Sequence, residues 1–244
     1  LLLAGRRFFA LPVAPVAPGS GRPTHAVYGF TSVLSSVLRA EVPTQIAVAC
    51  DVSRQTFRMA EYSDYKAGRS ATPDEFKGQV SLVHEVLDAL RIPHVEVDGF
   101  EADDLLATLT TMAIEQAGID EVLICSGDRD TFQLVTDKVT VLYPVKGVSE
   151  LARMTPATVE KKYGVPPERY SDLAALVGET SDNLPGVPGV GPKTAAKWIT
   201  QYGDLTGVDA HTADTPGKTR QYMRGNRDLG RPHVRPHQLA HAAP

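Results

Sequence analysis

The stretch GFEADDLLATL, residues 99–109, places Glu101, Asp103 and Asp104 directly before a run of leucines. Carboxylates this close repel one another by roughly 3–4 kcal/mol per pair at an effective dielectric constant near 20. Two explanations fit such a group. The acids are either solvated and cap the apolar helix that follows, or they surround a bound cation.

Two further apolar runs also end in acid. TQIAVACD ends at Asp51, and EVLICSGDRD carries Asp128 and Asp130. Such runs suit strands of a parallel sheet that are buried on both faces. Because ligands bind outside the carboxyl ends of such strands, we expect these acids to converge with the group at residues 101–104. Mg²⁺ or Mn²⁺ prefers such oxygen ligands, and two ions about 4 Å apart form a site that cleaves phosphodiesters.

Alternatives to this metal site stay open on these residues alone. Any one acid at a strand end or helix start also fits a structural cap. The segment SGDRDTF matches the Asp-x-Asp-x-Thr pattern of haloacid-dehalogenase-type phosphatases, with Asp128 as the nucleophile. That short match leaves the acids of EADD unexplained, so the phosphatase is the weaker interpretation.

A glycine-rich turn, LPGVPGVGPKTA, follows later in the chain. Gly186, Gly189 and Gly191 permit close approach of the backbone to an anion, and Lys193 stands at the start of the next helix. This pattern is typical of a helix-hairpin-helix that binds the DNA backbone without reading sequence, although a plain connector between two helices also fits. A phosphate-binding P-loop is excluded because no Gly-Lys-Ser/Thr occurs at its spacing.

Two other segments contribute charged residues, one acidic and one basic, to the candidate site. GETSDN, before the glycine turn, supplies Glu179 and Asp182, which could reach one ion together. Residues 51–72 interleave basic residues, which neutralise phosphates, with aromatic rings, which stack on unpaired bases. A solvated surface loop is the alternative for that segment. Its basic and aromatic residues are Arg54, Phe57, Arg58, Tyr62, Tyr65, Lys66 and Arg69.

The formal net charge of −4 argues against a nucleic-acid-binding protein at first sight. Setting aside the eight candidate metal ligands leaves 21 acids against the 25 lysines and arginines of the chain. The remainder is mildly basic, so the charge does not exclude DNA. The eight ligands are Asp51, Glu101, Asp103, Asp104, Asp128, Asp130, Glu179 and Asp182.

Alternation of strand-like and helix-like segments predicts an α/β fold with a doubly wound, mainly parallel sheet over residues 1–150. Residues 151–205 have a helical pattern, with Thr155 as an expected cap and Gly164 as an expected stop. Residues 206–244 show no sustained period, and we expect them to be disordered or loosely attached. Four of the seven histidines lie there, at a spacing too irregular to indicate a metal site.

No apolar run approaches the roughly 20 residues that span a bilayer, so no membrane partner is expected. Cys50 and Cys125 lie in apolar, strand-like runs without histidines at ligand spacing. This indicates buried free thiols in a reducing compartment, and a cytoplasmic protein.

Several motifs together resemble the 5′-nuclease domain at the N-terminus of bacterial DNA polymerase I, a relative of flap endonucleases with a PIN-like fold. The motifs include AVACDVSRQTFR, EYSDYKAGRSATPDEFKGQ, VDGFEADDLLATL, ICSGDRDTFQLV and GETSDNLPGVPGVGPKTAAKWI, over residues 24–205. The resemblance implies a structure-specific 5′→3′ exonuclease and flap endonuclease that needs Mg²⁺ or Mn²⁺ and acts on flaps and nicked or branched duplex. It also implies a monomer in the bacterial nucleoid, with a polymerase fused to it or associated with it.

Carried over by residue, the resemblance assigns Asp51, Glu101, Asp103, Asp104 and Asp128 to a first metal region. It assigns Asp130, Glu179 and Asp182 to a second region, and Lys66 and Arg69 to the scissile phosphate. Arg54, Arg58 and Tyr65 fall in the DNA-contacting segment. Residues Gly186 to Thr194, with Lys193, match the hairpin that grips duplex, often with a K⁺ ion.

Three departures from the family pattern qualify this assignment. Ala4 and Gly5 stand where the family has Asp-Gly, so either the first metal aspartate and its loop are absent or the N-terminus of the sequence is mis-specified. Glu179 stands where Asp is usual, and the helical continuation expected near residue 205 gives way to the patternless segment. The alternative function is therefore a catalytically impaired remnant that still binds DNA.

Overall fold

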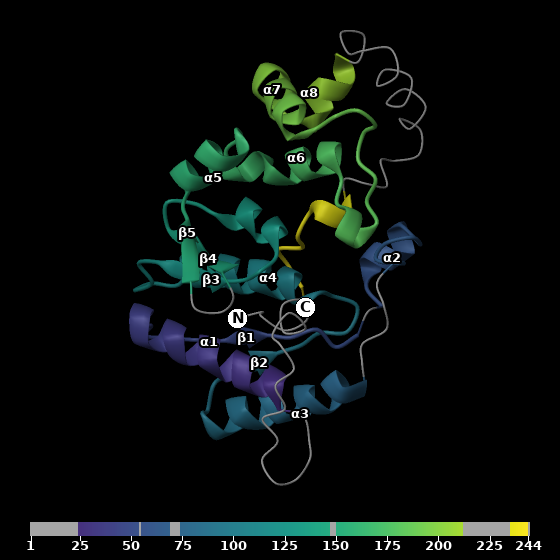
Figure 1. Cartoon of the computed structure of the whole chain (residues 1–244). Coiled ribbons are helices and arrows are strands. Elements are labelled where there is room, and N and C mark those ends of the chain that lie inside the picture. The colour runs from purple at the N-terminus through teal and green to yellow at the C-terminus, as the bar shows by residue number, and fades with distance from the viewer. Residues whose placement is uncertain (1–23, 54, 69–73, 147–149, 212–234, 244) are drawn as a thin grey trace.

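The computed structural model describes residues 24–53, 55–68, 74–146, 150–211 and 235–243. Three layers follow one another along the long axis of the molecule (Figure 1). They are a layer of the helices His25–Glu41 and Asp74–Ala89, a middle layer that contains the strands, and a helical tier that follows residue 155. The first half of the chain contains α1 (His25–Glu41), β1 (Val48–Ala49), α2 (Phe57–Glu61), α3 (Asp74–Ala89), β2 (His94–Val95), α4 (Ala102–Glu115) and β3 (Val122–Cys125). The second half contains η2 (Arg129–Leu134), β4 (Val139–Lys146), β5 (Glu150–Met154), α5 (Pro156–Tyr163), η3 (Pro167–Arg169), α6 (Tyr170–Val177), η4 (Thr180–Asp182), α7 (Pro192–Tyr202), α8 (Leu205–Ala210) and η6 (Arg235–His237).

The strands form two small sheets in the described part of the chain. β1 pairs in parallel with β2, with Val48 opposite His94. β3 pairs in parallel with β4, and β4 pairs antiparallel with β5. The prediction of an α/β fold with mainly parallel strands is confirmed, because two of the three described strand pairings are parallel and the pairing of β4 with β5 is antiparallel. Only residues 147–149 separate β4 from β5, and a parallel crossover needs a dozen residues or more.

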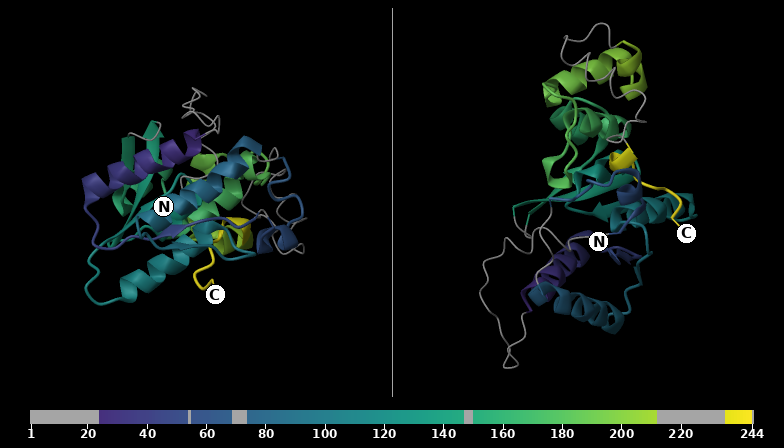
Figure 2. Two further views of the ribbon diagram at one scale, coloured as in Figure 1. Left: turned by 90° about the horizontal axis from the view of Figure 1, so that it is seen from below. Right: turned by 90° about the vertical axis from the view of Figure 1, so that its right-hand side faces the viewer.

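The central strands β3 and β4 divide the apolar residues into two clusters. Ile124 and Val141 face the cluster formed with α4 to α7, whereas Cys125 and Leu142 face the cluster formed with α1 and α3. This alternation follows from the two-residue period of a strand. Figure 2 shows α1 and α3 side by side on the same side of the molecule, away from α5 to α8. The sheet is therefore covered by helices on both faces.

The helical tier begins at α5 and not at residue 151, because β5 occupies residues 150–154. Thr155 caps α5 by accepting a hydrogen bond from the backbone N–H of Thr158, and Gly164 ends it at φ 76°. Both were predicted from sequence. α6 and α7 pack together, and the single tryptophan of the chain, Trp198, contributes to the buried face of α7.

Within the segment at residues 206–244, the described residues 206–211 and 235–243 are more ordered than expected. α8 begins at the end of residues 24–205, which carry the family motifs. Asp204 caps it by accepting a hydrogen bond of 2.7 Å from the N–H of Gly207. Residues 235–243 lie across α4, where Leu239 enters the main apolar cluster. The expectation of a loosely attached tail is thus wrong for these described parts. Single apolar anchors such as Val208 and Leu239 are too few to create a sequence period.

Neither cysteine is in a disulfide, as predicted. Cys125 is buried and Cys50 half-buried, and burial raises the pKa of each thiol to about 11, which keeps both thiols protonated at neutral pH. Among the described helices, none is long and apolar enough to span a bilayer.

Candidate functional site

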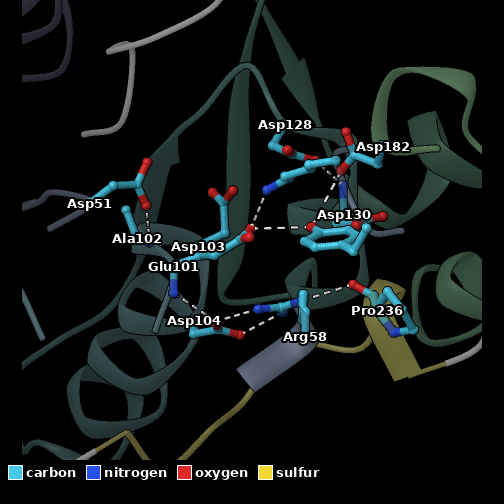
Figure 3. Close-up of polar contacts among 12 residues, drawn as sticks. Asp51, Arg58, Glu101, Ala102, Asp103, Asp104, Asp128, Asp130, Asp182 and Pro236 are labelled. Atoms are coloured by element: carbon cyan, nitrogen blue, oxygen red, sulfur yellow. Dashed lines mark hydrogen bonds and ion pairs between the residues drawn. The ribbon is translucent and has the colours of Figure 1, made fainter. Parts of the chain in front are cut away.

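The N-terminus of α4 gathers several of the predicted acids (Figure 3). Asp51, from the end of β1, accepts a hydrogen bond of 2.7 Å from the backbone N–H of Ala102. Asp104 accepts a hydrogen bond of 3.0 Å from the N–H of Glu101. Two acids therefore cap the helix, one of the explanations that the sequence left open. Capping uses one oxygen of Asp51 and leaves the rest of its carboxylate in an exposed position.

Asp104 forms a buried ion pair with Arg58. The guanidinium donates two parallel hydrogen bonds, of 2.6 and 2.7 Å, to the two carboxylate oxygens. Its other donors reach the carbonyl oxygens of Pro236 at 2.9 Å and Gln238 at 3.0 Å. Burial lowers the pKa of Arg58, but the hydrogen bond and charge of Asp104 outweigh it, so the pKa lies above its ordinary value.

This ion pair corrects two predictions. Asp104 is completely buried and its charge is matched by Arg58, so it is not available as a metal ligand. Arg58 is 1% exposed and has no access to a DNA phosphate. The spacing of basic and aromatic residues in the 51–72 segment could not show this, because α2 turns Arg58 toward the protein interior.

The other acids of the first region lie near one another, and Lys66 is the cation that the described residues place beside them. Ser126 donates a hydrogen bond of 3.3 Å to Asp103. Burial, followed by the charges of Asp128, Asp51 and Glu101, raises the pKa of Asp103 well above its usual range. Burial and the charge of Asp130 raise the pKa of Asp128 to about 7. Burial and mutual repulsion of carboxylates raise pKa values in this way.

Lys66 and Tyr65 approach the cluster from the basic segment. Lys66 Nζ lies 2.6 Å from Oε2 of Glu101. The Tyr65 hydroxyl lies 3.3 Å from that same oxygen and 3.3 Å from Oδ2 of Asp182, so it joins the two predicted metal regions. Tyr65 is 3% exposed, which corrects its assignment as a DNA-contacting side chain. Arg54 and Arg69 lie outside the described residues.

The backbone fixes Lys66 in place. Its φ of 57° is in the left-handed region, and its N–H donates a hydrogen bond of 2.9 Å to the carbonyl oxygen of Asp182. Asn183 adds a hydrogen bond of 2.8 Å from its side chain to the carbonyl oxygen of Asp64. The basic segment and the GETSDN loop are therefore held together, a contact that sequence spacing did not predict.

The second region contains Asp130, Glu179 and Asp182. Asp130 and Asp182 are buried, whereas Glu179 is half-buried and accepts a hydrogen bond of 2.6 Å from Ser181. One ligand atom each from Asp130, Glu179 and His237 lie within 4.8 Å of one another. Of the described residues, these three form the only such triad, and the acids of the first region are spread more widely.

Two glycines fix the loop that carries Glu179. Gly178 (φ 79°) and Gly186 (φ 62°) pack backbone to backbone. A Cβ on Gly178 would lie 2.5 Å from the N of Gly186, and a Cβ on Gly186 would meet the carbonyl of Val177. Gly186 thus has a structural role in positioning Glu179, apart from any contact with DNA.

The other hairpin residues are divided, because Val190 is buried whereas Gly189, Gly191, Lys193 and Thr194 are exposed. Gly191 precedes α7, Pro192 is its first residue, and Lys193 and Thr194 are exposed at its first turn. A Cβ on Gly189 or Gly191 would meet nothing within 4 Å among the described residues. This end of α7 presents backbone N–H groups beside a lysine, an arrangement suited to a phosphate.

Comparison with known proteins decides the family. Residues 2–164 match the family described as 5′-3′ exonuclease, N-terminal resolvase-like domain, and residues 165–235 match 5′-3′ exonuclease, C-terminal SAM fold. The chain belongs to the 5′-3′ exonuclease family. The predicted resemblance is thereby confirmed, and it extends beyond residues 24–205. The departure at Ala4 and Gly5 lies outside the described residues.

Curated relatives of this 5′-3′ exonuclease domain are bacterial DNA polymerases. DNA polymerase I of Mycobacterium tuberculosis (strain H37Rv) is 56% identical over 224 residues, which are 92% of this chain and 25% of that protein. DNA polymerase I of Bacillus subtilis (strain 168) is 43% identical over 216 residues, 88% of this chain and 24% of that protein. The chain spans about a quarter of the length of these relatives.

Solved structures share the fold at low sequence identity. T5 5′-exonuclease with bound zinc superimposes with a TM-score of 0.71 and 22% identity, covering 87% of this chain and 81% of that one. The catalytic core of Rad2 in complex with DNA gives a TM-score of 0.52 and 14% identity, covering 88% and 67%. These matches confirm the predicted 5′-nuclease fold.

Sequence reasoning missed three residues of the site. Ser126 orients Asp103, Gln133 holds the backbone at residues 237–239, and His237 lies against Asp130. Ser126 directly follows β3, a position that could have indicated its role. For His237 no local signal exists, because its contacts join positions more than 100 residues apart.

Proposed function

We propose that this domain hydrolyses DNA phosphodiesters at 5′ ends and 5′ flaps, with Mg²⁺ or Mn²⁺ as its cofactor. The observation that carries the proposal is the gathering of Asp51, Glu101 and Asp128 around Asp103, with Lys66 paired to Glu101, in a fold of the 5′-3′ exonuclease family. A carboxylate cluster with raised pKa values and one nearby cation suits divalent cations and a phosphate.

The donor set fits hydrated Mg²⁺ or Mn²⁺. Mg²⁺ keeps several waters and binds through one or two carboxylates, so acids spread more widely than a closed triad are suitable ligands. Asp51, Glu101, Asp103 and Asp128 would hold ions in the first region, and Asp130, Glu179 and Asp182 in the second. When bound, the ions supply positive charge to the phosphate and lower the pKa of water.

Side chains of the basic segment have defined tasks in this proposal. Lys66 is partly exposed and directs its ammonium at the acidic cluster, where it would stabilise negative charge on the phosphate. The Tyr65 hydroxyl, placed between Glu101 and Asp182, holds the two carboxylates in fixed positions. Arg69, three residues beyond Lys66, remains a proposed phosphate contact.

Duplex binding is assigned to the N-terminal end of α7. Gly189, Gly191, Lys193 and Thr194 are exposed there and would contact the phosphate backbone, with K⁺ as an expected ion at the hairpin. Such contacts are independent of base sequence, which agrees with recognition of a DNA structure. Arg54 is retained as a proposed contact near the same substrate.

The relatives support a proposal about the cellular setting. We propose a monomeric nuclease unit that works in the bacterial cytoplasm, on chromosomal DNA, together with a DNA polymerase activity. The support is the match of this chain to about a quarter of bacterial DNA polymerase I.

The test is cleavage of a 5′-labelled flap by the purified chain with Mg²⁺, Mn²⁺ and Ca²⁺ in parallel. Short 5′ products with Mg²⁺ or Mn²⁺, and none with Ca²⁺, are expected. Asp128→Asn should abolish cleavage and change DNA affinity by less than about threefold, because the backbone contacts remain. Asp137→Asn, at an exposed position outside the cluster, is the matched control.

Two outcomes would contradict the proposal. Full cleavage by the Asp128→Asn variant would remove the acidic cluster from the chemistry. Flap binding without cleavage in any metal would instead support the impaired, DNA-binding alternative.

A further inference from the structure

Residues 235–243 form a strap that passes from α6 to α4 (yellow in Figure 1). Arg58 donates hydrogen bonds to two of its carbonyl oxygens, those of Pro236 at 2.9 Å and Gln238 at 3.0 Å. Figure 3 shows Pro236 on one side of this guanidinium and Asp104 on the other. The buried ion pair of Arg58 and Asp104 therefore also anchors the strap.

Further contacts fix the rest of the strap on α4. The N–H of Ala240 donates a hydrogen bond of 2.9 Å to Asp104, and the N–H of Ala243 donates one of 3.0 Å to the Thr108 hydroxyl. Leu239 is 7% exposed and lies in the main apolar cluster. A strap that buries an apolar side chain and is bonded at several backbone groups has one defined closed position.

The closed strap places His237 against the second metal region. This side chain is 0% exposed, and its Nδ1 lies 3.2 and 3.4 Å from the two carboxylate oxygens of Asp130. A ring nitrogen also lies within 4.8 Å of a carboxylate oxygen of Glu179. Gln133 donates a hydrogen bond of 2.7 Å to the carbonyl oxygen of His237 and accepts one of 3.2 Å from the N–H of Leu239. Since the ring is fully buried and its backbone is held, it leaves Asp130 only if the strap moves.

The position of His237 matters for a divalent ion at Asp130. Mg²⁺ demands a near-octahedral shell of oxygens and keeps several waters, so an ion on this carboxylate needs free space around it. The imidazole fills that space, at hydrogen-bond distance from both oxygens. Imidazole suits zinc and copper, whereas Mg²⁺ and Mn²⁺ take carboxylate, carbonyl and water oxygens, so the ring does not substitute for a ligand of these ions. Strap closure and ion binding at Asp130 are thus expected to exclude each other.

We propose that residues 235–243 are an autoinhibitory strap, which when closed keeps the second Mg²⁺ or Mn²⁺ ion from Asp130 and which opens when that ion binds. The inference rests on the proposed metal role of Asp130, Glu179 and Asp182. The family match ends at residue 235, so the metal region lies within the matched residues and nearly all of the strap lies beyond them. Because such coupling is reciprocal, the strap weakens ion binding by the same factor by which the ion weakens strap closure.

Mn²⁺ binding by the chelator-treated full chain measures the first half of this coupling, with electron paramagnetic resonance of the free ion as the readout. His237→Ala removes the ring from Asp130, and Leu239→Ala loosens the strap at its apolar anchor. Both variants should tighten the weakest class of Mn²⁺ sites at least about fivefold. Gln238→Ala is the matched control, with a change below about twofold, because that side chain is exposed and its carbonyl bond to Arg58 is kept.

Hydrogen exchange followed by mass spectrometry measures the second half, on the unchanged chain. The N–H groups of Leu239, Ala240 and Ala243 are bonded to the core in the closed strap, so they exchange slowly while it is closed. Saturating Mn²⁺ should speed exchange in the peptide that contains them at least about fivefold. Peptides of α1, on the other face of the sheet, serve as the internal reference and should change by less than about twofold.

Three results would overturn the proposal: weaker Mn²⁺ binding in His237→Ala, which would make the ring a support of the ion, unchanged Mn²⁺ affinity in both strap variants, or unchanged or slower exchange of the strap with Mn²⁺. Because the exchange measurement needs no variant, it decides even where a variant fails to fold. A chain that binds Mn²⁺ as expected without cutting a flap contradicts the proposed nuclease function alone. A chain that cuts a flap, with unchanged Mn²⁺ affinity in both variants, contradicts the strap alone.

Discussion

The buried ion pair between Arg58 and Asp104 offers a direct test of what holds the C-terminal segment in place. Arg58→Met keeps the length of the side chain and removes the charge. Asp104 then retains hydrogen bonds only from the backbone N–H groups of Glu101 and Ala240 among the contacts described here. The carbonyl oxygen of Pro236 loses its guanidinium donor as well.

The magnitude follows from burial. Both side chains are 1% exposed or less, and breaking such a pair by removing one partner costs about 3–5 kcal/mol. The free energy of unfolding of a domain is only about 5–15 kcal/mol, so Arg58→Met should remove a large share of it. Replacing both residues, as Arg58→Met with Asp104→Leu, leaves no unpaired charge and should cost less than the sum of the single changes by about 3 kcal/mol.

Urea denaturation followed by circular dichroism measures these differences in chelator-treated protein. With a slope near 2 kcal/mol per molar urea, a loss of about 4 kcal/mol moves the midpoint down by about 2 M. A shift below about 0.5 M for Arg58→Met would refute the reasoning, because it would mean that water screens the pair. Strict additivity in the double variant would refute it in the same way.

Three further outcomes are expected. The folded state raises the pKa of Asp128, so the metal-free chain should lose stability as the pH rises from about 4 to 7. Relative to the unchanged chain, Asp128→Asn should be more stable above pH 7 by on the order of 4 kcal/mol and equally stable near pH 4. Equal melting curves of the two proteins at pH 8 would contradict this. Gly186→Ala should destabilise the chain by roughly 3 kcal/mol or more in thermal melts, because the added Cβ would clash with the backbone of Val177. Gly191→Ala, where a Cβ meets nothing within 4 Å among the described residues, should cost about 1 kcal/mol or less. Similar losses for the two variants would exclude the backbone clash. Lys66→Met should lower kcat on a flap about 100-fold with a smaller change in DNA affinity, and an unchanged kcat would remove the ammonium from the chemistry.

Local sequence pattern predicted the parts of the site that depend on strand ends and helix starts. Asp51 and the acids near Asp128 follow apolar strands, and Glu101 is the N-cap of α4, so their approach could be foreseen from the topology of an α/β fold. The caps of α5 at Thr155 and Gly164 were equally readable, because capping is a local property of the backbone.

The directions of the Arg58 and Tyr65 side chains could not be predicted from sequence in the same way. Arg58 and Tyr65 stand in a segment rich in basic and aromatic residues, which suggests a surface that contacts DNA. The fold instead buries both, one against Asp104 and one between Glu101 and Asp182. An arginine or a tyrosine has the same charge and ring whether it contacts DNA or is buried in the protein. Only the position of α2 and of the turn after it in the folded structure distinguishes the two cases.

Contacts across long stretches of sequence were also beyond prediction. His237 meets Asp130 and Gln133 across more than 100 residues, without any periodic pattern in its own segment. Residues 235–243 are placed by polar side chains of the core that bond to their backbone. Hydrogen bonds to backbone carbonyls and N–H groups leave little trace in side-chain identity, because every residue except proline offers both groups.

The division of the apolar residues between the two faces of the central sheet has a consequence for local unfolding. The layer of α1 and α3 packs on alternate residues of β3 and β4 and on Val48 of β1. A buried hydrogen bond of 2.7 Å from the N–H of Ala26 to Gln79 joins its two helices. Such a layer is a candidate foldon, a unit that opens as a whole at a lower free energy than global unfolding. Slow amide exchange would then concentrate in α4 and the strands, on the side where the carboxylates gather.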